Sequence, residues 1–205
     1  MEIVKIEKAL ELLRAEKKRK FIQTVDLIVN LKNFDARKEG VNSFIEIPNL
    51  AEKKIAGFLT KKSELVDSIT EKDFVNYKNP RDLKRLAKKY DFFIAAAPLM
   101  GKIATAFGRV LGPIGKMPSP QAGIMPIDND AAIKATIEKV EKMIRIRTKE
   151  RSIKISIGKE DMEDEKLKQN IDAAAHAIEN LLPRKNDNIK DVLIKFSMTK
   201  PVRVR

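Results

Sequence analysis

The sequence predicts a mixed α/β and α+β protein of two domains, one inserted into the other. Both ends of the chain combine a helix with strands of alternating polarity, whereas the middle alternates apolar strands with helices. The first 50 and the last 63 residues are each too short to enclose a comfortable core, but together they supply 113 residues. We therefore predict that residues 1–50 and 143–205 form domain I and that residues 51–142 form an inserted domain II.

The start of the chain predicts one helix and two strands. Residues 3–17 have the spacing of an amphipathic helix, whose apolar face would hold Val4, Ile6, Ala9, Leu10 and Leu13. In residues 21–31, valines and leucines alternate with mostly polar residues, the period of a half-buried strand. A turn around Gly40 leads into a second strand over 41–47, which Pro48 closes.

The middle of the chain predicts an open α/β domain. We expect strands over 54–60 and 91–97, a helical turn beginning at Ser63, and helices over 80–90, 98–110 and 129–143. The nearly unbroken apolar run at 91–97 is typical of a parallel sheet covered on both faces. Residues 98–126 hold five of the nine prolines and five of the eight glycines, which indicates a long loop of functional interest.

The end of the chain returns to the alternating pattern. Residues 144–148 and 152–157 predict two strands paired around residues 149–151. Residues 162–182 predict a helix with one apolar stripe, stopped by Pro183. A strand over 192–198 and a short extension over 202–204 complete this part.

The charge balance points to a polyanionic partner. There are 42 lysines and arginines against 29 acidic residues, a net charge of +13, while 43% of the residues are hydrophobic. This combination indicates a folded protein with a strongly basic surface, which usually meets nucleic acid or anionic lipid.

The composition also excludes several classes of site. The chain has no cysteine and a single histidine, His176, so thiolate metal sites, cysteine nucleophiles and multi-histidine metal sites are excluded. The acidic residues at 161–165 suit the start of a helix better than a metal site. No apolar run has the length of a membrane span, and the first residues do not resemble a signal peptide. We therefore expect a cytoplasmic protein without a metal or cofactor.

The glycine-rich stretch before Lys116 does not fit a phosphate-binding loop. Val110 stands where a Walker loop needs glycine, and Met117 stands where it needs serine or threonine. A loop stiffened by prolines is the simpler interpretation. An enzyme acting here on a phosphorylated substrate stays open as an alternative, with Lys116, Arg109 and Asp128 as the groups at hand.

Two short segments of predicted domain I suit RNA. The basic run at 17–20 precedes Phe21 and Thr24 on the first predicted strand, and Ser-Met-Thr occupies 197–199 on a late strand. Hydroxyl groups bond 2′-hydroxyls and phosphates, while phenylalanine and methionine stack on sugars or bases. The same apolar residues are also common in cores, so composition alone gives a modest signal.

The stretch LGPIGKMPSP closely resembles the signature of the ribosomal protein L-one family. DFFIAAAPLMGKIATAFGRV before it, KFIQTVDLIVNLKNFDARK near the start and IKFSMTKPVRVR at the end are also similar to that family. Order and spacing match over nearly the whole chain, and the length and short termini resemble the archaeal type.

The resemblance implies both a fold and a function. Domain I would be a split α+β sandwich, and domain II a Rossmann-like, three-layer α/β domain without nucleotide chemistry. The protein would be a non-enzymatic constituent of the large ribosomal subunit in the cytoplasm, a monomer when free. It would bind the stalk region of large-subunit rRNA, assist release of deacylated tRNA from the exit site, and repress its own mRNA. A dedicated mRNA-binding repressor, or an accessory RNA-binding protein outside the ribosome, is the alternative.

The resemblance also implies site residues. By motif, the RNA-binding positions fall on Lys20, Phe21, Thr24, Asp26, Arg147, Thr148, Lys149, Ser197, Met198 and Thr199. The signature loop holds Gly112, Pro113, Gly115, Lys116, Met117, Pro118 and Pro120. Residues 147–149 would belong to a hairpin that approaches the RNA.

This sequence departs from the family pattern at three places. Thr199 stands where the family usually has glycine, and its Cβ would crowd a close approach of the backbone to RNA. Lys200-Pro201 replaces a bacterial Gly-Pro pair, and Ile114 stands where arginine is common.

Overall fold

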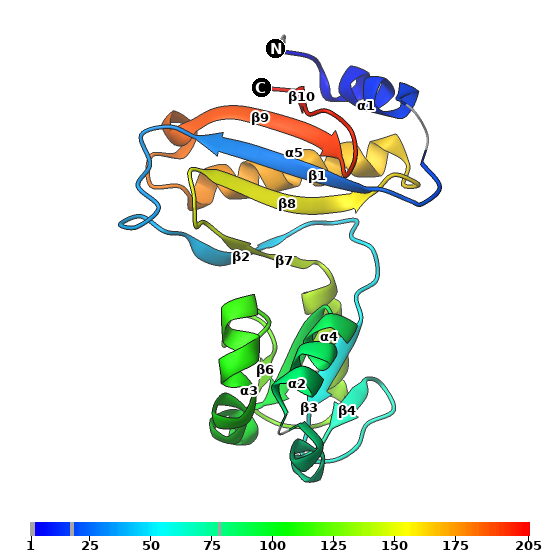
Figure 1. The fold of residues 1–205 in the computed structure, drawn as a ribbon, viewed down its shortest axis with the longest axis vertical. Coiled ribbons are helices and arrows are strands. Elements are labelled where there is room, and N and C mark those ends of the chain that lie inside the picture. Colours follow the sequence, from blue (N-terminus) through cyan, green and yellow to red (C-terminus); the bar gives the residue numbers. More distant parts are fainter. Residues whose placement is uncertain (1–2, 17–18, 78) are drawn as a thin grey trace. The chain divides into compact units, whose positions relative to one another are not determined.

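The computed structural model describes residues 3–16, 19–77 and 79–205, and it confirms the mixed α/β fold (Figure 1). The chain divides into two compact units. Unit 1 comprises Met1–Ala51 and Lys142–Arg205, and unit 2 comprises Glu52–Glu141. The basic run predicted at 17–20 lies partly outside the described residues, since 17 and 18 are not among them.

Unit 1 is built on a four-stranded antiparallel sheet. Its strand order is β10 (Val202–Arg203), β9 (Ile189–Phe196), β1 (Thr24–Leu31) and β8 (Ser152–Lys159). Helices α1 (Ile6–Ala15) and α5 (Asp164–Leu181) contribute to the same hydrophobic core as the sheet. Figure 1 shows β9, β1 and β8 side by side, with α5 behind them.

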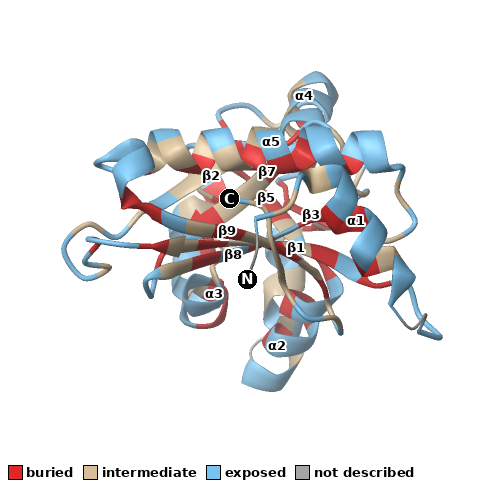
Figure 2. Cartoon of the chain, turned by 90° about the horizontal axis from the view of Figure 1, so that it is seen from above, coloured by how far each residue is buried: buried red, intermediate tan, exposed pale blue. Residues whose placement is uncertain are grey.

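The predicted alternation along β1 is confirmed. Val25, Leu27, Val29 and Leu31 are buried, and the residues between them are more exposed. The same division is visible along α5 and the strands in Figure 2, where buried and exposed residues occupy different sides. One face of the sheet therefore covers the core, because successive side chains of a strand point to opposite faces.

A second, two-stranded sheet completes unit 1, and it corrects one prediction. Strand β7 (Met143–Arg147) pairs with β2 (Asn42–Glu46), whereas β8 pairs with β1. The predicted pairing of 144–148 with 152–157 is therefore wrong. The facing ends of β7 and β8 are held by different partners, since the Thr148 N–H donates to the Val41 carbonyl and the Leu31 N–H donates to the Arg151 carbonyl.

Unit 2 is a three-layer domain on a parallel sheet. The strand order is β4 (Asp67–Ile69), β3 (Ile55–Phe58), β5 (Phe92–Ala96) and β6 (Ile124–Met125). Phe58 and Phe93 face a core shared with helices α2 (Pro80–Lys89) and α3 (Met100–Ile114). Ile94 faces a separate core shared with α4 (Asp130–Glu141). Both faces of the sheet are covered, which explains the nearly continuous apolar run at 91–97.

Two local predictions in unit 2 are wrong. No helical turn begins at Ser63, because the chain there forms a loop in which the Ser63 N–H donates to the Ser68 hydroxyl. Strand β4 and a 3-10 helix, η1 (Glu71–Tyr77), follow instead. Helix α3 also runs four residues beyond the predicted end at Val110. The proline- and glycine-rich stretch is therefore mostly helical at its start, and its remaining loop is short.

Short 3-10 helices complete the description. These are η2 (Ala97–Leu99), which leads directly into α3, and η3 (Lys185–Asn188), which precedes β9. Within the described ranges, no helix combines the length and the apolar character needed to cross a membrane.

Candidate RNA-binding surface

Thr24 and Ser197 lie side by side at one end of the unit 1 sheet, although 173 positions separate them. Their hydroxyl oxygens are 2.6 Å apart. The Ser197 N–H donates to the Thr24 carbonyl at 3.1 Å, and the Thr24 N–H donates to the Ser197 hydroxyl at 3.2 Å. Antiparallel pairing brings the start of β1 against the end of β9 and so places the two hydroxyls together.

The residues next to this pair lie outside the strands, which corrects the sequence prediction. Strand β1 begins at Thr24, so Phe21 precedes it, and β9 ends at Phe196, so residues 197–199 form a turn. The turn is closed by a hydrogen bond from the Phe196 N–H to the Thr199 hydroxyl at 2.9 Å. Met198 therefore lies at the tip of a turn and not within a β-strand.

Exposed apolar side chains flank the hydroxyl pair. Phe21 is 55% exposed and Met198 is 58% exposed, and Ile22 beside Phe21 is exposed as well. Arg19 and Lys20, both exposed, precede Phe21 directly. We call Arg19, Lys20, Phe21, Thr24, Ser197 and Met198 the sheet-end surface. Exposed apolar side chains that are grouped beside polar and charged groups are characteristic of interaction surfaces.

The structure explains why threonine is tolerated at position 199. Outside glycine, the described residues adopt positive φ only at Asn33 and Lys185, so the Thr199 backbone is in a region open to any residue. Its hydroxyl turns back onto the Phe196 backbone. The Cβ at this position is therefore accommodated without backbone strain.

Asp26 lies two residues along β1 from Thr24, on the face of the sheet that the core does not occupy. Its neighbours in register are Ser156 of β8 and Lys195 of β9. Burial raises the pKa of the Asp26 carboxyl, and the positive charge of Lys195 opposes that shift. Asp26 is thus the acidic centre of a row whose other members are a hydroxyl and an ammonium group.

The third group of predicted RNA-binding residues, at positions 147–149, does not lie at the sheet-end surface. Lys149 lies two residues before Arg151, whose carbonyl meets the far end of β1 at Leu31. The eight residues of β1 place about 23 Å between the two ends. Thr148 is only 6% exposed, and its hydroxyl accepts the Val41 N–H at 2.6 Å. Only Arg147 and Lys149 of this group are exposed.

The signature loop in unit 2 connects the C-terminal ends of two helices. Gly112 and Pro113 lie in the last turn of α3, and Gly115 ends that helix with φ of 81°. The Lys116 ammonium donates to the carbonyls of Ala87 at 2.9 Å and Tyr90 at 2.7 Å, at the end of α2. A cation at a helix C-terminus satisfies the last carbonyls and complements the helix dipole. The loop therefore ties the end of α3 to the end of α2.

The remaining loop residues are also engaged in the fold. Met117 packs on the unit 2 core and Pro118 is buried, while Pro120 is exposed. Asp128 accepts hydrogen bonds from the Thr60 N–H and hydroxyl, both at 2.6 Å. Since Lys116 and Asp128 both hold backbone in place, the structure offers no support for an acid–base pair acting on a phosphorylated substrate.

Sequence reasoning missed two residues that build the sheet-end surface. Gln23 is 2% exposed, and its side-chain oxygen accepts the Met198 N–H at 3.0 Å. Glu160, at the end of β8, accepts the Gln23 N–H on its carboxylate at 3.2 Å and donates its own N–H to the Gln23 carbonyl at 2.8 Å. These contacts join three chain segments, and no local pattern in the sequence marks them.

The basic composition and the split antiparallel unit with an inserted parallel unit define the class of this chain as a basic α/β protein of two units. The chain belongs to the Ribosomal protein L1p/L10e family, whose model matches residues 13–200.

Curated relatives agree with this membership over most of both chains. The chain is 40% identical to the large ribosomal subunit protein uL1 of Thermococcus kodakarensis, covering 92% of this chain and 90% of the relative. It is 36% identical to uL1 of Nanoarchaeum equitans, covering 93% and 95%. It is also 36% identical to uL1 of Pyrococcus horikoshii, covering 92% and 89%. The resemblance to archaeal members of the family is therefore confirmed.

Proposed function

We propose that this chain is a structural constituent of the large ribosomal subunit and binds ribosomal RNA through the sheet-end surface of unit 1. Family membership and the names of the relatives support the ribosomal role. The observation that carries the choice of surface is the Thr24–Ser197 hydroxyl pair flanked by exposed Phe21 and Met198.

Each group on this surface has a defined task toward RNA. The two hydroxyls bond a ribose 2′-hydroxyl or a phosphate oxygen, and Phe21 and Met198 pack on sugars or bases. Arg19 and Lys20 pair with phosphates and supply affinity that falls as salt rises. None of these tasks makes or breaks a covalent bond, so the proposed role is binding and not catalysis.

The RNA we propose is the stalk region of large-subunit rRNA near the tRNA exit site. In this setting unit 2 meets exit-site tRNA, and the protein assists release of deacylated tRNA. The same surface also binds the protein's own mRNA and so represses its translation, because an mRNA segment folded like the rRNA site is bound in the same way. The alternative is a dedicated repressor or accessory protein that never joins the ribosome.

A binding experiment tests the RNA assignment. The chain is titrated with a stalk-rRNA fragment and with an unrelated hairpin of the same length, across a series of salt concentrations. We expect a preference for the stalk fragment that persists at moderate salt. Equal binding of both RNAs that collapses as salt rises would reduce the +13 charge to a nonspecific polyanion surface.

Sedimentation separates the ribosomal role from its alternative. Tagged protein expressed in an archaeal host is followed through a sucrose gradient of its ribosomes. We expect it in the large-subunit and monosome fractions after a high-salt wash. Protein found only in the light fractions would support the repressor or accessory alternative.

A further inference from the structure

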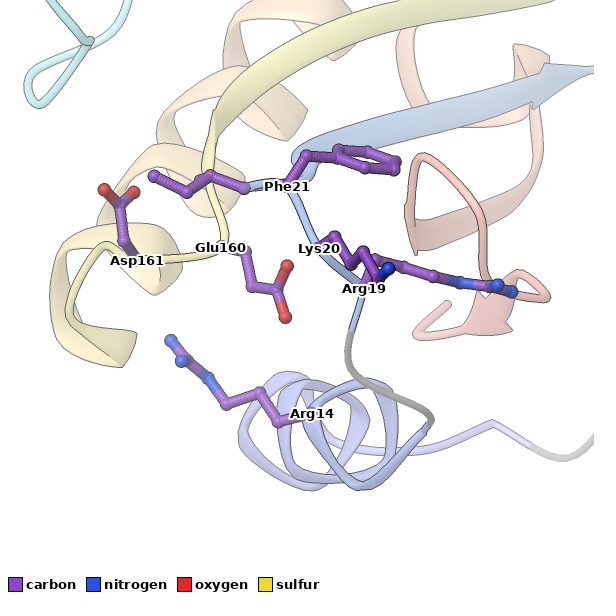
Figure 3. Close-up of a pocket in the computed structure, with 7 residues that line it drawn as sticks. Arg14, Arg19, Lys20, Phe21, Glu160 and Asp161 are labelled. Carbon is purple, nitrogen blue, oxygen red and sulfur yellow. The ribbon is translucent and has the colours of Figure 1, made fainter.

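A groove of about 770 Å³ opens beside the sheet-end surface (Figure 3). It lies between α1, the segment that leads into β1, and the turn that follows β8. The groove is lined by Arg14, Arg19, Lys20, Phe21, Ile22, Glu160 and Asp161. The groove thus extends the sheet-end surface into a recess that is lined by both charged and apolar side chains.

A carboxylate lies at the centre of this basic recess. Figure 3 shows the Glu160 carboxylate pointing into the groove between Arg14 and Lys20. A recess that served only to bind phosphate would gain nothing from a negative charge there, since carboxylate and phosphate repel each other. A carboxylate accepts hydrogen bonds and donates none, so a ligand that binds to it must supply the donors.

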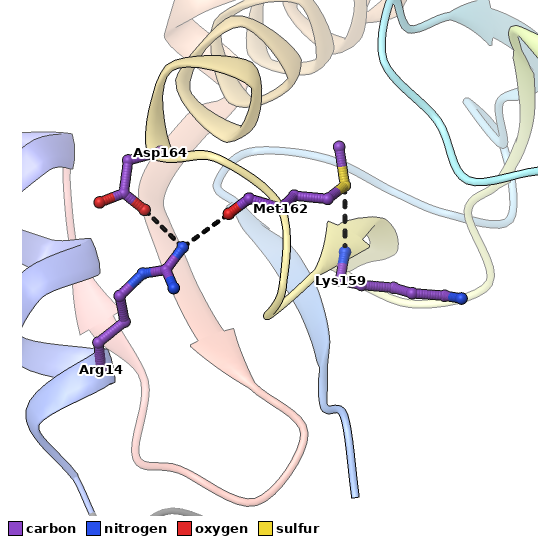
Figure 4. Close-up of polar contacts among 4 residues, drawn as sticks. All are labelled: Arg14, Lys159, Met162 and Asp164. Carbon is purple, nitrogen blue, oxygen red and sulfur yellow. Dashed lines mark hydrogen bonds and ion pairs between the residues drawn. The ribbon is translucent and has the colours of Figure 1, made fainter.

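The surroundings hold Glu160 in place. One carboxylate oxygen accepts the Gln23 N–H, and the Glu160 N–H bonds the Gln23 carbonyl, so side chain and backbone are both anchored. The turn beyond it is fixed by Arg14, whose guanidinium donates to the Met162 carbonyl at 2.7 Å and to Asp164 at 2.6 Å (Figure 4). The Lys159 N–H, 3.4 Å from the Met162 sulfur, closes the same turn. A fixed acceptor favours one orientation of its ligand.

Among the four RNA bases, guanine has the hydrogen-bonding groups that match a carboxylate. Unpaired bases in RNA are read on their Watson–Crick edges while they stack on aromatic side chains. On that edge guanine presents two adjacent donors, N1–H and the N2 amino group, which match the two oxygens of a carboxylate. Adenine and cytosine each place an acceptor beside their amino group, and uracil flanks its single N–H with two carbonyls.

We propose that Glu160 reads an unpaired guanine of the bound RNA, which enters the groove beside Phe21 with its Watson–Crick edge toward the carboxylate. Arg19 and Lys20 then hold the phosphates on either side of the flipped nucleotide. This role deepens the proposed function and rests on it, because it assumes that structured RNA binds the sheet-end surface.

The sign of the charge effect makes the test sharp. Glu160→Gln removes a negative charge from a basic surface, so nonspecific electrostatics alone would tighten RNA binding. We expect Glu160→Gln to weaken binding of the stalk-rRNA fragment about ten-fold, the loss of a two-bond base contact. We expect the same variant to bind the unrelated hairpin as tightly as the wild type or more tightly. Glu138→Gln, which removes the same charge at an exposed position of unit 2 away from the groove, should bind the stalk fragment without loss.

Two further measurements address the base and the fold. Each unpaired guanine of the fragment is replaced in turn by inosine, which lacks the N2 amino group. At one position we expect a loss with the wild type that disappears with Glu160→Gln. Glu160→Asp keeps the charge but shortens the side chain, and it should also bind more weakly. Melting curves of all variants confirm that they fold.

The outcomes separate this inference from the proposed function. If the wild type prefers the stalk fragment and Glu160→Gln binds it as tightly or more tightly, guanine reading is overturned and the proposed function stands. If no inosine substitution affects the wild type, guanine reading is also overturned. If the wild type itself shows no preference for the stalk fragment, the proposed function fails first.

Discussion

The side-chain oxygen of Gln23 accepts a hydrogen bond from the Met198 N–H at 3.0 Å, joining residues 175 positions apart. Gln23 is nearly fully buried, whereas Met198 is among the most exposed apolar side chains of the described residues. A buried amide thus anchors the backbone of an exposed turn residue.

Loss of the exposed apolar side chains should weaken RNA binding without weakening the fold. Phe21→Ala and Met198→Ala should each cost about 1–3 kcal/mol of binding free energy toward the stalk fragment, the usual range for a side chain stacked on RNA. Ile127→Ala, an exposed apolar residue of unit 2, is the control and should bind normally. Filter-binding isotherms and melting curves measure the two effects. Normal binding by both folded variants would show that the surface is misassigned.

Gln23→Leu should reduce both stability and RNA affinity. The change removes the acceptor of the Met198 N–H and leaves that donor poorly satisfied, at a cost of about 1 kcal/mol in the free energy of unfolding. RNA binding should fall several-fold, since the turn that carries Met198 loosens. Gln121→Leu, at an exposed position of unit 2, serves as the control. A variant that melts and binds like the wild type would contradict the positioning role of Gln23.

Lys116→Ala should destabilise unit 2 and leave RNA binding by unit 1 unchanged. The ammonium group bonds two carbonyls at the end of α2, and its loss should cost about 1–2 kcal/mol. Lys134→Ala, an exposed lysine on α4, should have almost no effect on stability. Urea unfolding and stalk-fragment binding are measured on the same preparations. An enzymatic turnover that disappears with Lys116 would revive the alternative of a phosphate-acting enzyme.

Asp26 should make unit 1 less stable as its carboxyl ionises. Burial raises the pKa of this group in the folded state, so the folded protein holds the proton more tightly than the unfolded chain does. The stabilisation is therefore complete below the ordinary pKa of aspartate, about 4, and is lost as pH rises through the raised value. Asp26→Asn should gain stability relative to the wild type over the same pH range.

The measurement for Asp26 is a series of urea unfolding curves between about pH 3 and pH 7, where the aspartate titrates. Asp187→Asn, at an exposed position of η3, is measured in parallel as the control substitution. A stability difference between Asp26→Asn and the wild type that stays constant with pH would contradict a raised pKa for Asp26.

The sequence correctly predicts those elements in which the spacing of apolar residues reflects which side chains are buried. The alternation in β1 and the apolar run of β5 both depend on neighbours within a few residues, and both predictions are confirmed. The predicted helical turn at Ser63 is wrong because the hydrogen bonds of Ser63 reach Ser68 and Asp130, not the next turn of a helix. The predicted partner of β7 is wrong because the observed partner, β2, lies about a hundred residues earlier in the chain.

The candidate surface shows the same division. Phe21, Thr24, Ser197 and Met198 are indicated by residue type and by family resemblance, and the structure places them at one end of a sheet. Gln23 and Glu160 are not indicated, because a glutamine or glutamate beside a strand looks like any solvated residue. Their roles come from contacts between distant segments, which local propensity does not encode.

The position of β1 between β8 and β9 also orders events during biosynthesis. The strand made first stands in the interior of the finished sheet, and both of its neighbours are translated more than a hundred residues later. Unit 2 is complete once residue 141 has emerged, whereas unit 1 must wait for residues 189–203. Until the last strands arrive, Thr24 has no Ser197 beside it. The Thr24–Ser197 pair can therefore form only after nearly all of unit 1 has been translated, so the candidate surface depends on pairing between the earliest and the latest strands of the unit.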